Sequence, residues 1–184
     1  MLIIGVLKEP GNDTPVSLVP DIAAALVKNN IPVLVEEGAG AKAFHADQQY
    51  EATGAKVVSR AEVLAQAQLL LSIHAPENSE MDALSSGRVL LGVYQPLFHA
   101  VKMKDWAAKG LTVFSLDTLP RTTRAQAMDV LSSQANIAGY KAVLLAANIY
   151  PRYFPMFMTA AGSIPPAKVL ILGAGVAGLQ AIAT

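Results

Sequence analysis

The sequence contains no cysteine, and this and other absences exclude several classes of protein. Without cysteine neither a disulfide framework nor a thiolate metal site can form, which fits a cytoplasmic protein. Its three histidines are scattered rather than spaced as metal ligands, so we predict no metal site. No apolar run reaches the roughly 18 residues that a membrane helix needs. The first residues also lack the basic start and the cleavage site of a signal peptide.

Net charge is absent as well, because 14 Lys and Arg residues balance 14 Asp and Glu residues. A protein that binds nucleic acid normally carries a basic patch, so we expect no nucleic-acid partner. Charged residues make up only 15% of the chain and hydrophobic residues 53%. This composition is apolar for a soluble protein.

Short apolar runs alternate with helical segments through the first 120 residues. Runs of three to six residues without polar alternation predict strands buried on both faces, at 2–7, 32–35, 56–58, 69–73, 89–93 and 112–115. Helical patterns lie between them, at 21–29, 47–53, 61–66 and 101–109, and Gly54 and Gly110 are placed to end two of these helices. The alternation predicts an α/β fold for residues 1–120, a doubly wound parallel sheet of the flavodoxin or Rossmann type.

A long helix is predicted next, over 123–147, within an interdomain segment 121–149. Thr123 and Gln126 have the spacing of a capping box at its start. An apolar seam recurs at helical spacing, at Met128, Leu131, Ala135, Ala138, Ala142 and Leu145. A second, uncharged polar stripe follows at Gln126, Asp129, Ser133, Asn136 and Tyr140, which indicates a partly buried face that makes directed hydrogen bonds. Gly139, unfavourable inside a helix, indicates close packing at that point.

Residues 150–184 have the pattern that begins a second Rossmann domain. We expect a short helical piece at 152–160, a strand at 168–172 and a helix at 176–184. Between strand and helix lies a GxGxxG motif, formed by Gly173, Ala174, Gly175, Val176, Ala177 and Gly178. In such a motif the glycines allow a tight turn, approach of a pyrophosphate to the backbone, and close helix packing. The acidic ribose ligand expected about 20 residues later lies beyond residue 184. We therefore expect a fragment of a larger protein that binds NAD(H) weakly or not at all by itself.

Two stretches, PRTTRAQAMDVLSSQANIAGYKAV and TAAGSIPPAKVLILGAGVAGLQAIAT, resemble the NAD(H)-binding domain I of proton-translocating NAD(P) transhydrogenases, at the N-terminus of the alpha subunit. Weaker matches are KEP near the start and EEGAG at 36–40. The resemblance implies that Arg121, Gln126, Asp129 and Ser132 face the nicotinamide. It also implies NAD(H) as cofactor, a homodimer, NADP(H) on a partner domain and membrane-spanning partners that couple hydride exchange to proton translocation, with this chain on the cytoplasmic side of the inner membrane. No catalytic residue is assigned.

Alanine dehydrogenase, which has the same architecture, is the first alternative. Its substrate-binding Arg, catalytic Lys and catalytic His fall here on Pro15, His74 and Gln95, so the groups for carboxylate capture and proton transfer are missing. Transhydrogenases also commonly carry the Arg where Pro15 stands, so the N-terminal part departs from both patterns. A non-catalytic nucleotide-binding or oligomerisation module is the second alternative.

The three histidines and one aromatic cluster are further candidates for functional residues, but the sequence assigns them no chemical role. His45 and His99 are expected on surface loops, whereas His74 ends a buried strand, equally compatible with a ligand contact and a structural one. The aromatic cluster Tyr150, Tyr153, Phe154 and Phe157 fits an interdomain or dimer contact better than a cofactor pocket.

Overall fold

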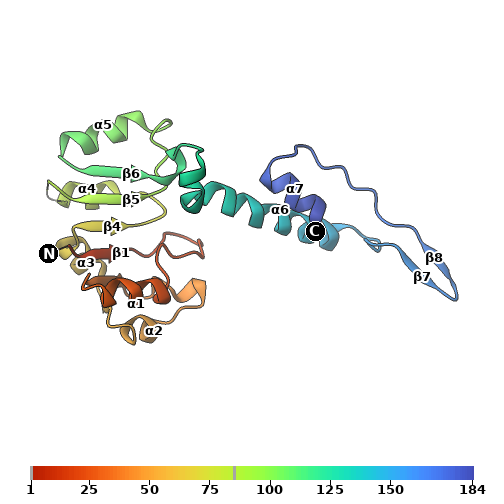
Figure 1. Ribbon diagram of the computed structural model, residues 1–184, viewed down its shortest axis with the longest axis horizontal. Coiled ribbons are helices and arrows are strands. Elements are labelled where there is room, and N and C mark those ends of the chain that lie inside the picture. Colours follow the sequence, from red (N-terminus) through yellow and green to blue (C-terminus); the bar gives the residue numbers. More distant parts are fainter. Residues whose placement is uncertain (1, 85) are drawn as a thin grey trace. The chain divides into compact units, whose positions relative to one another are not determined.

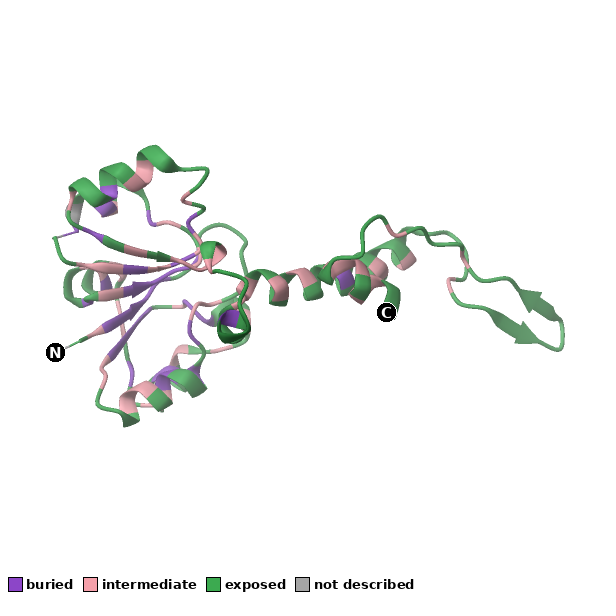
Figure 2. Cartoon of the chain, turned by 45° about the horizontal axis from the view of Figure 1, so that its top comes forward, coloured by how far each residue is buried: buried purple, intermediate pink, exposed green. Residues whose placement is uncertain are grey.

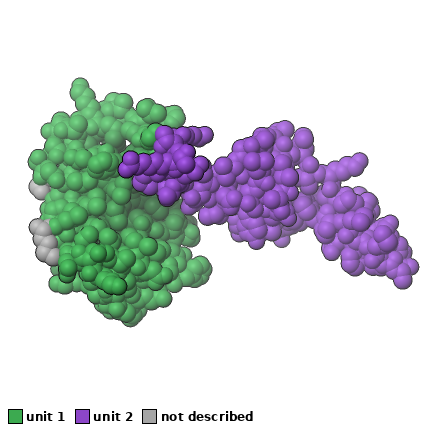
Figure 3. Space-filling model, viewed as in Figure 1, with its two compact units in different colours: residues 1–120 green, residues 121–184 purple. Residues whose placement is uncertain are grey.

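The computed structural model describes residues 2–84 and 86–184, and the chain divides into two compact units (Figures 1 and 3). The first covers residues 1–120 and the second residues 121–184.

The first unit is built on a six-stranded parallel sheet with the order β3-β2-β1-β4-β5-β6. The strands are β1 (Ile4–Val6), β2 (Val33–Glu36), β3 (Lys56–Val58), β4 (Leu69–Leu71), β5 (Val89–Gly92) and β6 (Thr112–Ser115). All six predicted strands of this part are confirmed, although several are shorter than their apolar runs. The strand order reverses between β1 and β4. In doubly wound sheets the crevice at such a reversal, outside the carboxyl ends of the strands, is the usual place for a ligand.

Helices cover both faces of this sheet, so the doubly wound fold is confirmed. They are α1 (Pro20–Lys28), α2 (Asp47–Glu51), α3 (Arg60–Gln66), α4 (Asn78–Ala83) and α5 (Ala100–Ala108), with 3-10 turns η1 (Ala41–Ala43) and η2 (Leu116–Thr118). One core cluster joins α1 and α2 to the sheet through Ala23 and Tyr50, and the other joins α3 and α5 through Val63 and Trp106. Figure 2 shows the central strands of the sheet as largely buried, whereas the edge strands β3 and β6 are partly exposed. The burial on both faces that the sequence predicts for 56–58 and 112–115 is therefore wrong, because an edge strand has a neighbour on one side only. Gly110 directly follows the C-cap of α5 with a positive φ of 72°, as predicted.

The second unit contains η3 (Thr123–Met128), α6 (Val130–Ile149), an antiparallel hairpin of β7 (Phe157–Thr159) and β8 (Gly162–Ile164), and α7 (Val176–Ala183). The long helix therefore begins at Val130, and the predicted start at Thr123 is wrong. Asp129 is the N-cap of α6, and its side chain accepts the backbone N–H of Ser132. The predicted capping box is also wrong, since η3 has no side-chain cap. Asp is a stronger N-cap than Thr. The helix therefore begins directly after Asp129 rather than at Thr123.

Two further predictions for the second unit are wrong. Residues 152–160, expected to be helical, instead contain β7, because Pro155 lacks an N–H and disfavours helical backbone in the residue before it. Residues 168–172 are not a strand, since no strand of the described chain pairs with them and an unpaired strand leaves its backbone groups without partners. The helix predicted at 176–184 is confirmed as α7.

The apolar seam of α6 lies mostly on its open surface within this unit, contrary to the burial that an apolar seam suggests. Leu131 is 45% exposed and Leu145 is 59% exposed. The less exposed residues of α6 are mostly small, and of them only Ala135 belongs to the predicted seam: Val130, Ser132, Ala135, Gly139, Val143 and Ala147. At Gly139 the absence of a side chain lets the backbones of α6 and α7 approach closely. Throughout residues 2–84 and 86–184, every helix is too short or too polar to cross a bilayer.

Candidate cofactor site

The glycine motif forms the turn that enters α7, and each glycine meets a different physical requirement. Gly173 has a φ of +105°, which a residue with a Cβ rarely adopts. A Cβ on Gly175 would meet no atom within 4 Å, so the backbone there is open to a ligand. A Cβ on Gly178 would lie 2.9 Å from the carbonyl carbon of Gly173, so this glycine lets α7 pack against its own turn. The three positions thus have the geometry of a dinucleotide turn.

The N-terminus of α7 offers an anion site at the same turn. Gly175 is the N-cap, and it provides no side chain to occupy the free N–H groups that follow. The first intrahelical bond runs from Leu179 N–H to Gly175 O at 2.8 Å. The amides of Val176, Ala177 and Gly178 precede it and have no intrahelical acceptor. Such N–H groups, with the positive end of the helix dipole, favour a phosphate.

Two of the four residues expected at the nicotinamide are in direct contact at the N-terminus of α6. Asp129 accepts the Ser132 N–H through Oδ1 at 2.9 Å and the Ser132 hydroxyl through Oδ2 at 2.6 Å. These hydrogen bonds, helped by the charge of Arg121, hold the pKa of Asp129 below its ordinary value. The carboxylate therefore remains ionised at neutral pH. A carboxylate has about four acceptor positions in total, so it can still accept from a further donor.

Gln126 and Arg121 lie just before this cap. The carbonyl oxygen of Gln126 accepts the Asp129 N–H at 3.2 Å, and both the Gln126 and Arg121 side chains are exposed. The segment 121–132 thus presents a guanidinium, an amide, a carboxylate and a hydroxyl within one short stretch. A carboxamide needs one donor and two acceptors, and this set can supply both.

The remaining members of the polar stripe do not all face outward from α6. Ser133 bonds back to the Asp129 carbonyl oxygen at 3.0 Å, and Tyr140 is 46% exposed. Asn136 instead donates to Gln180 of α7 at 2.8 Å. Gly139 is the buried residue of α6, so the predicted close packing is confirmed. The sequence could not identify α7 as the packing partner of Gly139, because no sequence pattern relates two helices about 40 residues apart.

In the first unit, charged side chains pair with one another in the crevice at the ends of β1 and β4. Arg60 pairs with both Glu36, at 2.8 Å, and Glu80. Glu36 also accepts the Lys8 N–H at 2.7 Å, which ties the KEP and EEGAG motifs together. The cavity here measures about 370 Å³. With its arginine held by two carboxylates, the crevice offers a poor receptor for another carboxylate.

His74, for which the sequence suggests no partner, contacts two carboxylates at this crevice. Its Nδ1 lies 3.0 Å from Glu9 Oε2, and its Nε2 lies 3.3 Å from Asp13. The buried Glu9 also accepts the backbone N–H groups of Ile73, at 2.6 Å, and His74, at 2.9 Å. Glu9 thus fastens the loop after β1 to the end of β4, which gives His74 a structural partner. Pro15 and Gln95 are both exposed.

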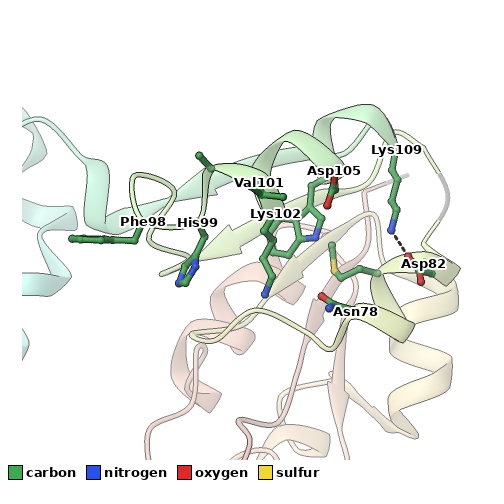
Figure 4. Close-up of a pocket in the computed structure, with 11 residues that line it drawn as sticks. Asn78, Asp82, Phe98, His99, Val101, Lys102, Asp105 and Lys109 are labelled. Carbon is green, nitrogen blue, oxygen red and sulfur yellow. Dashed lines mark hydrogen bonds and ion pairs between the residues drawn. The ribbon is translucent and has the colours of Figure 1, made fainter.

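A second cavity, of about 640 Å³, lies between α4 and α5 (Figure 4). Two of its lysines have partners, since Lys109 pairs with Asp82 and the Lys102 ammonium lies 5.5 Å from the centre of the Trp106 ring. His99 lines this cavity and is exposed. His45 packs edge-on against Tyr50, with ring centres 6.5 Å apart. Within the described residues, no group of three His, Cys, Asp or Glu side chains could hold a metal ion.

Comparisons with known proteins match both units. Residues 5–138 match the family described as alanine dehydrogenase/PNT, N-terminal domain, and residues 142–184 match the corresponding C-terminal domain. The chain is 44% identical over 170 residues to the NAD(P) transhydrogenase subunit alpha of Cereibacter sphaeroides, covering 92% of this chain and 32% of that protein.

Solved structures give the same match. The transhydrogenase from Sinorhizobium meliloti superposes with a TM-score of 0.92 and 43% identity, covering 98% of this chain and 55% of that one. An L-alanine dehydrogenase superposes with a TM-score of 0.85 and 27% identity, covering 99% of this chain and 51% of that one. The chain therefore spans between about a third and about half of the length of these relatives. The resemblance to transhydrogenases noted in the sequence is confirmed.

Proposed function

Because the chain belongs to the alanine dehydrogenase/PNT family, we propose that it forms part of the NAD(H)-binding component of an NAD(P) transhydrogenase. The observation that carries the proposal is the combination found within residues 121–184. A glycine turn open to a pyrophosphate enters α7, and a cluster able to pair with a carboxamide lies at the start of α6. A nicotinamide dinucleotide needs both features.

The residues of the chain bind and orient the cofactor in this proposal. The amides of Val176, Ala177 and Gly178 hold the pyrophosphate, with Gly175 giving it room. Asp129 accepts from the carboxamide NH2, and Arg121 or Ser132 donates to the carboxamide oxygen. Gln126 orients the ring or the ribose without adding a charge near the reacting carbon.

When bound, NADH would supply a hydride to NADP+ held on a partner domain, which would give NAD+ and NADPH, and the reverse exchange would regenerate NADH and NADP+. No proton is taken up or released in this exchange. The protein must therefore supply geometry rather than a general acid or base.

The first unit favours this function over amino-acid dehydrogenation. A dehydrogenase for alanine must capture a carboxylate and move a proton. Here Arg60 is held by Glu36 and Glu80, and Gln95 stands where the dehydrogenases have their catalytic His. The transhydrogenases compared above also share more of the sequence than the alanine dehydrogenase does.

The experiment is a hydride-exchange assay on the polypeptide at the full length that its gene encodes, assembled with its membrane partners. Reduction of an NAD analogue by NADPH is the expected result. NADH production that depends on alanine and needs no partner would identify an alanine dehydrogenase instead. Binding of NADH with neither activity would leave a passive nucleotide-binding module.

The partners proposed are an NADP(H)-binding domain and membrane-spanning segments that couple the exchange to proton translocation, with this chain on the cytoplasmic side. A second copy of the chain is also expected. The exposed seam of α6 and the aromatic pairs near the hairpin, such as Tyr153 with Phe157 at 5.3 Å between ring centres, are large apolar surfaces that suit a two-fold dimer. Light scattering at tens of micromolar should give a dimer mass, and a monomer mass would contradict this part of the proposal.

A further inference from the structure

Gly139 lies where α6 touches the first turn of α7. A Cβ at this position would lie 2.9 Å from the carbonyl carbon of Ala177 and 3.0 Å from its Cα, with the carbonyl oxygen nearer still. All three atoms belong to backbone, so no side chain could rotate away to make room. The two helices can approach to this distance only because residue 139 has no side chain.

One turn earlier on α6, a side-chain hydrogen bond reaches the same helix. Asn136 Nδ2 donates to Gln180 Oε1 at 2.8 Å. Gln180 follows Ala177 by three residues, and Asn136 precedes Gly139 by three, so both contacts lie along one line between the helices. The hydrogen bond therefore fixes how α7 sits along α6, whereas Gly139 fixes how close it comes.

Ser132 lies on this same face of α6, since Ser132, Asn136 and Gly139 follow one another at spacings of four and three residues. Seven residues of helix separate Ser132 from Gly139, about 10 Å along the axis. Ser132 belongs to the proposed nicotinamide contact, and Ala177 belongs to the turn proposed for the pyrophosphate. One helix face thus joins the two ends of the proposed site.

We infer that Gly139 and Asn136 are positioning residues, which set the place of the pyrophosphate-binding turn relative to the nicotinamide-binding end of α6. This inference rests on the proposed function. Neither residue needs to touch the cofactor. Each acts through α7, whose first-turn amides move as a unit with the helix.

The test substitutes Gly139→Ala in the assembled enzyme. Alanine favours helix over glycine, so the change should not weaken α6 itself. It should displace the first turn of α7 by about 1 Å, which can slow a reaction that depends on geometry on the order of 100-fold. We expect kcat for hydride exchange to fall by about that factor, while the thermal midpoint stays close to that of the wild type. Gln134→Ala, on the opposite and exposed side of α6, is the matched control and should change neither value.

The hydrogen bond is tested by exchange of its two partners. Asn136→Gln and Gln180→Asn each mismatch the length of the pair and should raise the KM for NADH about three- to tenfold. The double exchange restores the combined length of the two side chains, so it should recover most of the wild-type KM. A residue that only stabilised the fold would not show this rescue.

The outcomes separate the inference from the proposed function. Loss of exchange activity in Gly139→Ala, with activity in the wild type, supports both. Wild-type kinetics in Gly139→Ala and no rescue in the double exchange would overturn the inference and leave the function intact. If the wild type shows no exchange, the same variants are compared by their Kd for NADH, where equal values overturn the inference. Failure of the wild type to bind NADH would overturn both.

Discussion

Asp129→Asn separates the two tasks that the structure places on one side chain. Asp129 caps α6 by accepting the Ser132 N–H at 2.9 Å, and in the proposed function it also accepts from the nicotinamide carboxamide. Asparagine and aspartate are about equally good N-caps. The Oδ1 of asparagine can keep the bond to the Ser132 N–H, and the Ser132 hydroxyl can rotate to accept from the new amide. We therefore expect α6 to remain folded.

Cofactor binding should respond differently, because the substitution removes a charged acceptor. A hydrogen bond to a charged group contributes more than one between neutral groups. Loss of such a bond raises Kd about ten- to a hundredfold. We expect the Kd for NADH to rise by roughly this factor, measured by fluorescence titration of the assembled enzyme. Far-ultraviolet circular dichroism and urea unfolding of the 184-residue chain should match the wild type.

Asp129→Ala serves as the comparison, since it removes the cap and the acceptor together. It should lower both helical stability and NADH affinity. If Asp129→Asn binds NADH as tightly as the wild type while Asp129→Ala only loses helix stability, Asp129 is a helix cap alone. The assignment of this residue to the cofactor site would then be wrong.

Three further predictions concern other parts of the molecule. Gly175→Ala should leave the fold unchanged, because its Cβ would meet no atom within 4 Å. It should weaken NADH binding, because the added methyl group narrows the space through which the pyrophosphate approaches the backbone. Unchanged NADH affinity in a titration would mean that the pyrophosphate binds elsewhere. Gln126→Asn should slow hydride exchange on the order of 100-fold if the shorter side chain misplaces the ring by about 1 Å, and wild-type turnover would remove Gln126 from the site. The hydrogen bond from Arg60 lowers the pKa of Glu80 below 4.5, so the stability it contributes is present above pH 4.5 and is lost as the pH falls through the lower folded value. Urea unfolding should show this loss in the wild type and a smaller one in Arg60→Gln, and equal acid sensitivity would contradict it.

Much of the first unit could be predicted from the sequence, because its signals are local. Apolar runs such as 69–73 can be buried on both faces only in a parallel sheet covered by helices, and that is the fold found. The glycine motif could likewise be recognised, since a turn that needs a positive φ at Gly173 and open space at Gly175 admits few other residues. These features depend on each residue and its neighbours in sequence.

Tertiary structure decided the features that depend on competition or on distant partners. The start of α6 depended on whether Thr123 or Asp129 formed the better cap, and spacing alone did not rank them. Residues 168–172 have a strand pattern, but a strand also requires a neighbour to accept and donate its backbone hydrogen bonds. His74 found Glu9 across 65 residues, a contact that only the adjacency of β1 and β4 creates.

The face of α6 that packs was decided in the same way. Hydrophobicity favoured the seam through Leu131 and Leu145, whereas α7 packs on the smaller residues around Gly139. Close approach of two helix backbones depends on the absence of side-chain volume, which a hydrophobic pattern does not measure. The sequence by itself therefore determined the sheet and the glycine turn that enters α7, and the tertiary structure decided which helix surface holds that turn in place.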